Sequence, residues 1–110
     1  MEDELMNLDI SVEEAVKKLR NSDIGSSFEI ENERAINVSD KKIVILVASM
    51  YFMRAKNYAA ATVIFDNTEG TTRMQIIVSG SGYGAMGVDY GAEESFYKKI
   101  LNVFYENIKH

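Results

Sequence analysis

The sequence contains no cysteine and no proline, and its one histidine is the last residue, His110. The lack of cysteine excludes disulfides, thiolate nucleophiles and sulfur ligands for a metal. A histidine at the chain end would put a Ser–His or metal–His site on a fraying terminus. We therefore expect no catalytic residue, no metal site and no cofactor.

Positive charge is scarce as well. The net charge is −5 and the isoelectric point is near 4.8. Residues 1–33 carry a net charge of −7, whereas residues 34–73 carry +3. A surface that follows nucleic-acid phosphates needs clustered Lys and Arg, so this balance argues against a nucleic-acid partner.

The chain also has no long apolar run and no basic leader. Its longest apolar stretch, residues 43–53, is interrupted by Ser49 and is shorter than the ~20 residues needed to span a bilayer. The first residues, MEDELMNLDI, are acidic where a signal peptide would be basic. We expect a cytoplasmic protein without membrane contact, forming one domain over residues 1–110 in which residues 1–9 are flexible.

Two segments have the period of an amphipathic helix. Ser11 and Glu14 have capping-box spacing and precede a helical face, which predicts a helix over residues 11–21. A second helix is predicted over residues 92–108. Its apolar face comprises Phe96, Ile100, Val103, Phe104 and Ile108.

Between these helices the apolar residues alternate with period two. Short strands are predicted at 28–30 and 36–38, on either side of a turn at Asn32–Glu33. Further strands are predicted at residues 43–53, 59–66 and 72–79. Residues 43–53 could also form a buried helix, although their β-branched residues favour a strand. The order predicts an α+β fold, with a helix, an antiparallel meander of about five strands and a C-terminal helix, both helices packing on one face of the sheet.

The central strands carry apolar residues on both faces of the sheet. Two helices can cover only one of these faces. If Ile45, Val63 and Ile76 face the helices, a second apolar set lies on the other face of the sheet. That set is Leu46, Met50, Phe52, Ile64 and Ile77. Exposed apolar patches of this kind mark interfaces, and we expect a non-catalytic module that forms a homodimer through this face. The alternatives are a sheet curled tightly enough to bury both faces, or a helix at residues 43–53.

A glycine-rich segment follows the last predicted strand. Gly82, Gly84 and Gly87 form a literal G-x-G-x-x-G. A dinucleotide site needs a helix that begins within this motif and a second parallel strand after it, and neither is predicted here. We expect the glycines to allow a bulge or close backbone approach instead.

An alternative function is that of a carrier for a small apolar ligand. A pocket between the helices and the concave sheet would be lined by Tyr51, Phe65, Met74 and Phe104, with Arg54 and Tyr83 as polar contacts. An enzyme is the least favoured hypothesis, because no acid, base or nucleophile is placed beside a partner group.

Two stretches resemble a known family. YFMRAKNYAAATV at residues 51–63 and SGSGYGAMGVDYGAEESF at residues 79–96 are similar to segments of a family of small uncharacterised proteins from clostridia and bacilli. The resemblance covers residues 11–108. It implies a bacterial cytoplasmic protein of unknown role and identifies no functional residue.

Overall fold

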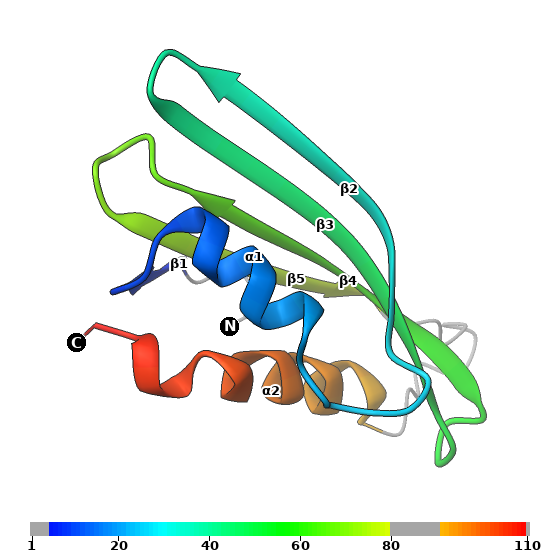
Figure 1. The fold of residues 1–110 in the computed structure, drawn as a ribbon. Helices are drawn as coiled ribbons and strands as arrows, with labels where there is room; N and C mark the ends of the chain where they lie inside the picture. Colours follow the sequence, from blue (N-terminus) through cyan, green and yellow to red (C-terminus); the bar gives the residue numbers. More distant parts are fainter. Residues whose placement is uncertain (1–4, 80–90, 110) are drawn as a thin grey trace.

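The computed structural model describes residues 5–79 and 91–109. Two helices lie on one face of a five-stranded antiparallel sheet, so the predicted α+β fold is confirmed (Figure 1). The strand order in the sheet is β1-β5-β4-β3-β2. The elements are β1 (Leu5–Leu8), α1 (Val12–Arg20), β2 (Glu29–Val38), β3 (Lys41–Phe52), β4 (Asn57–Asp66), β5 (Thr72–Ser79), α2 (Ala92–Val103) and the short 3₁₀ helix η2 (Tyr105–Asn107).

The capping box at the start of α1 is present. The backbone N–H of Glu14 donates to the Ser11 hydroxyl at 3.1 Å, and the backbone N–H of Ser11 donates to the Glu14 carboxylate at 2.9 Å. These two bonds satisfy backbone donors that a helix start would otherwise leave free. Val12, Ala15 and Leu19 are buried, so α1 presents its predicted apolar face to the sheet.

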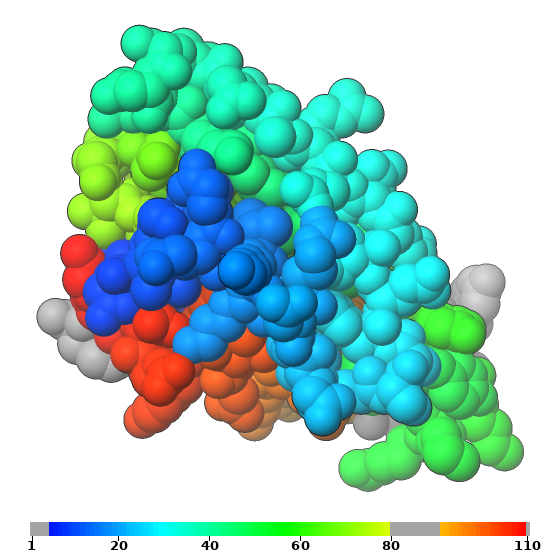
Figure 2. Space-filling view, in the orientation of Figure 1, coloured from blue at the N-terminus to red at the C-terminus, as the bar shows by residue number. Residues whose placement is uncertain are grey.

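Short turns join β2 to β5 into a meander. Ser39, Lys56 and Gly70 occupy these turns with φ of 58°, 54° and 97°. A positive φ reverses the chain within a few residues, which keeps consecutive strands adjacent. Seen from the helical side, the β2–β3 hairpin and the end of the β3–β4 hairpin extend past the two helices (Figure 2).

The N-terminal part of the meander differs from its prediction. Residues 29–38 form one strand, β2, and the turn expected at Asn32–Glu33 is a β-bulge between Ile30 and Asn32. The inserted residue, Glu31, accepts a hydrogen bond of 2.5 Å from the Ser49 hydroxyl of β3. A cluster of polar residues thus marks an irregularity within a strand, because a bulge tolerates the same residues as a turn.

The fifth strand comes instead from residues 1–9, where we expected a flexible lead. β1 pairs with β5, and Leu8, which is 2% exposed, forms a bridge with Ile108. Backbone hydrogen bonds from Asp9 to Asn107 (2.9 Å) and from Lys109 to Asn7 (2.8 Å) extend this contact. Ile108, predicted to belong to the helix face, therefore lies beyond α2 and contacts β1.

Residues 43–53 are strand rather than helix up to Phe52, but the predicted parity of β3 is wrong. Leu46 is fully buried and Met50 is 5% exposed, while Phe52 packs with its ring 5.7 Å from that of Phe96 in α2. The even-numbered residues of β3 therefore face the helices. On β4 and β5 the predicted parity is correct, since Val63 and Ile76 are fully buried.

Because the even-numbered side chains of β3 face the core, two neighbouring substitutions should lower the free energy of unfolding by different amounts. Leu46→Ala should lower the free energy of unfolding by about 3 kcal/mol, because it leaves a cavity in the packed core. Ile45→Ala, on the opposite face, should cost less than half as much. Urea unfolding at low protein concentration measures both values, and an equal or larger loss for Ile45→Ala would contradict the register.

Candidate functional site

The face of the sheet opposite the helices carries a cluster of apolar side chains on neighbouring strands. In the register, Ile36 is opposite Ile43, and Ile45 is opposite Ile64. We call this cluster the open face. It consists of Ile36, Ile43, Ile45, Val47, Ile64 and Ile77.

The side chains of the open face differ in how much of their surface is exposed. Ile36 and Ile77 are 42% and 39% exposed, and the other four members are partly buried by their neighbours in the sheet. A depression of about 410 Å³ lies over β2 and β3, lined by Asn32, Arg34, Ile36, Ile45 and Val47. A soluble domain usually places polar residues on an uncovered face of an antiparallel sheet, so this face has the composition of a contact surface.

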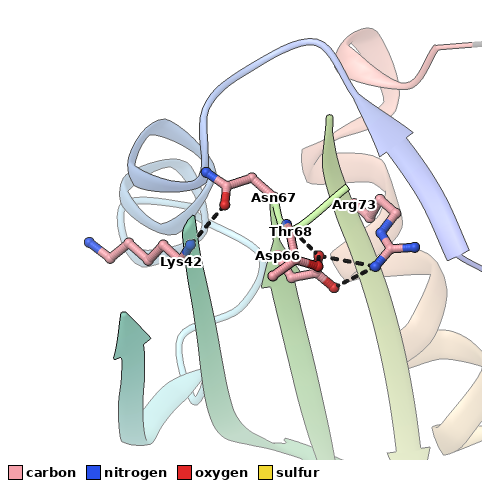
Figure 3. A network of polar contacts seen from close by, with 5 residues as sticks. All are labelled: Lys42, Asp66, Asn67, Thr68 and Arg73. Atoms are coloured by element: carbon pink, nitrogen blue, oxygen red, sulfur yellow. Dashed lines mark hydrogen bonds and ion pairs between the residues drawn. The ribbon is translucent and has the colours of Figure 1, made fainter. Parts of the chain in front are cut away.

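A polar network closes one end of the open face (Figure 3). The Arg73 guanidinium donates to both carboxylate oxygens of Asp66 at 3.1 Å, and the Thr68 backbone and hydroxyl donate to one of these oxygens. On the adjacent strand, the Lys42 backbone N–H donates to the Asn67 side chain at 2.8 Å. These bonds fix the β4–β5 turn against β3.

The same network sets the ionisation of Asp66. Burial raises the pKa of this carboxyl group, but hydrogen bonds from Thr68 and the charge of Arg73 outweigh burial and hold the pKa below its usual range. Because the folded-state pKa is the lower one, ionised Asp66 stabilises the fold above the unfolded-state pKa. This contribution is lost as pH falls through the folded-state pKa.

We expect Asp66→Asn to lower the free energy of unfolding by about 1 kcal/mol at neutral pH. The difference from the native chain should shrink as pH falls below about 4, where the native carboxyl group also becomes protonated. Denaturant unfolding at several pH values measures this difference. A loss that is independent of pH would show that the charge of Asp66 has no part in it.

The residues predicted for the interface divide between the two faces. Ile64 and Ile77 lie on the open face, whereas Leu46, Met50 and Phe52 lie on the helical side. Sequence reasoning missed the β3 members of the open face: Ile43, Ile45 and Val47. One signal could have identified them. After the two lysines that begin β3, the odd-numbered set includes the polar residue Ser49, whereas the even-numbered set from Val44 to Phe52 is apolar.

The predicted carrier pocket is filled by its own lining. Phe65, Met74 and Phe104 are fully buried, and the rings of Phe65 and Phe104 lie 5.5 Å apart. These three side chains are core residues. Tyr83 and the G-x-G-x-x-G motif lie outside the described residues.

The two remaining predicted ligand contacts, Tyr51 and Arg54, line a different hollow. It measures about 720 Å³ and lies between the end of the β3–β4 hairpin and α2. The hairpin contributes Met50, Tyr51, Phe52, Met53 and Arg54. The helix and its N-cap residue contribute Gly91, Ala92, Glu94, Ser95, Lys98 and Lys99. Lys98 and Lys99 are not among the predicted ligand contacts, because lysines on the polar face of a helix are ordinarily solvated.

Within residues 5–79 and 91–109 no three His, Cys, Asp or Glu side chains gather closely enough to hold a metal ion. In the same part of the chain, no helix has the length and apolar character needed to cross a membrane.

These features define a small α+β protein whose sheet is covered by helices on one face and carries a cluster of apolar side chains among polar ones on the other. The chain matches the model of a family of unknown function (DUF6054) over residues 1–108, and it belongs to that family. The predicted membership in a family of uncharacterised proteins is thus confirmed. No curated protein and no solved structure matches the chain.

Proposed function

We propose that this protein is a non-catalytic module that self-associates as a homodimer, with the open faces of two copies packed against each other. The observation that carries the proposal is a band of apolar residues that runs diagonally over the sheet face opposite the helices, from Ile36 on β2 to Ile77 on β5. Burial of such residues stabilises association by roughly 25 cal/mol for each Å² of apolar surface removed from water. The bacterial origin and cytoplasmic location implied by the resemblance are part of this proposal.

The size of the face supports a second copy as the occupant. Along the strands, the face extends from Lys41 to Ser49 of β3, which is roughly 27 Å at about 3.4 Å per residue. Across the strands, it extends from β2 to β5, which is roughly 19 Å at about 4.8 Å per strand. The two faces of a dimer would together bury a flat area of roughly 1,000 Å². The accessible surface is larger than this flat area because side chains project from the sheet. Specific protein interfaces begin near this size.

The distribution of charge also suits a symmetric pair. Asp66 and Arg73 neutralise each other at one end of the face. Consider a two-fold axis that lies in the interface, runs perpendicular to the strands and passes midway between Ile45 and Val47. This axis would place Ile45 opposite the partner's Val47. It would also place Arg34 opposite the partner's Asn32. Neither Arg34 nor Asp66 then meets a like charge, and Glu29, which pairs with Ser49 in the register, lies at the β2 edge of the interface. Two sheets packed in this way lie about 10 Å apart and share one apolar layer.

Ile45→Lys should dissociate the dimer, because it puts a charge at the centre of the apolar layer. We expect the dissociation constant to rise at least ~100-fold, which corresponds to about 2.7 kcal/mol. Sedimentation equilibrium over a concentration series measures this constant, and circular dichroism checks that the variant remains folded.

Tyr105→Lys is the matched control. Tyr105 is 71% exposed and lies in η2, away from the open face, so its replacement should leave the dissociation constant unchanged. The proposal fails if the native chain is a monomer at ~100 µM, or if Tyr105→Lys weakens association as much as Ile45→Lys. Leu46→Glu is unsuitable for this test, because a charge at that buried position should unfold the chain.

A further inference from the structure

The hollow between the β3–β4 hairpin and α2 is formed by elements that are fixed to each other. The edge-to-face contact of Phe52 with Phe96 joins the hairpin to the helix at 5.7 Å. On the other side of the hairpin, the Tyr51 backbone N–H donates to the Ser27 hydroxyl at 3.0 Å, where β2 no longer pairs with β3. The walls of the hollow are therefore held by the fold itself.

Gly25 holds one wall residue in place. A Cβ atom at Gly25 would come within 2.8 Å of the Met50 sulfur, so this glycine lets the α1–β2 connection pass directly against Met50. Met50 is 5% exposed and its side chain lines the hollow. Together with Phe52 and Met53, it makes the hairpin wall of the hollow apolar.

The charges around the hollow are unbalanced. Arg54, Lys98 and Lys99 line it, against the single carboxylate of Glu94. Glu94 pairs with Lys98 at 3.3 Å. The side chains of Arg54 and Lys99 have no hydrogen-bond or ion-pair partner within the described part of the chain, although Lys99 is partly buried. A partly buried ammonium group without a counter-charge favours an anion beside it.

We propose that this hollow binds a small amphiphilic carboxylate, such as a medium-chain fatty acid. The carboxylate pairs with Arg54 and Lys99, and the hydrocarbon chain packs against Met50 and Phe52. A volume of about 720 Å³ lies within the range typical of small-molecule sites. The apolar wall and the two cations, which have no partner among the described residues, are both needed for this assignment. An inorganic anion would leave the wall without a contact, and a neutral lipid would supply no counter-charge for Arg54 and Lys99.

A free acid fits better than a bilayer surface. The hollow is concave and lies between two elements, and Lys99 is partly buried there, which favours a ligand that enters the hollow. Arg54 lies in the exposed β3–β4 turn, so vesicle binding is included in the test below. The proposed site is separate from the open face and does not depend on self-association.

Titration of the full chain with decanoate, followed by calorimetry and by amide chemical shifts, tests the proposal. We expect saturable binding of one decanoate per chain, with shifts concentrated at residues 50–54 and 91–99. The double variant Arg54→Gln/Lys99→Gln should weaken binding at least ~10-fold, and raising the salt concentration should reduce this difference. Ser95→Trp, which fills the hollow from the helix side, should abolish binding.

The control double variant Lys17→Gln/Lys109→Gln removes the same net charge away from the hollow and should bind decanoate as the native chain does. Decyltrimethylammonium, with the same chain length and the opposite charge, should not bind. Equal binding of the two probes, or native affinity in Arg54→Gln/Lys99→Gln, overturns the proposal. Binding to phosphatidylglycerol vesicles without binding of decanoate would assign the cations to a lipid surface and also overturn it.

Discussion

The alternation of side chains along β3 is the constraint on which the rest of the structure depends. β3 pairs with β2 on one side and β4 on the other over almost its whole length, so a shift of one residue would exchange every side chain between the two faces. Its even-numbered residues fill the core beneath α1 and α2. Its odd-numbered residues form the centre of the open face, and its end carries one wall of the hollow. Core, candidate interface and candidate ligand site are therefore fixed by one register.

The elements that sequence reasoning predicted well are those whose signals are local. Ser11 and Glu14 start α1 within four residues, and β5 spans the predicted residues 72–79. β1 was missed because four residues of strand have no distinctive period and depend on a partner, β5, far along the chain. The bulge in β2 was read as a turn because polar residues suit both. Long-range pairing decides such cases, and a single sequence does not reveal it.

The candidate sites were predicted less well than the fold. A surplus of apolar residues on the second sheet face follows from composition, and the structure has one. Three of the five residues assigned to this face, Leu46, Met50 and Phe52, lie on the helical side instead. Branched side chains at Ile43, Ile45 and Val47 resemble a core strand as closely as Val44, Leu46 and Met50 do. The hollow depends on how α2 lies against the β3–β4 hairpin, a packing arrangement with no signature in either segment alone. Tyr51 and Arg54 were predicted to line a pocket between the helices and the sheet. They line the hollow beside the β3–β4 hairpin instead, so that prediction did not identify the hollow.

The two edges of the sheet are unequal. At one edge, β1 is four residues long and meets Ile108. At the other edge, β2 offers ten residues whose outer backbone groups meet no further strand among the described residues. Amyloid-like polymerisation by strand addition is a hazard of any bare edge, and β2 is the longer of the two edges for such pairing. The bulge and the glutamates at 29, 31 and 33 twist and charge that edge, which disfavours a flat, continuous stack of chains.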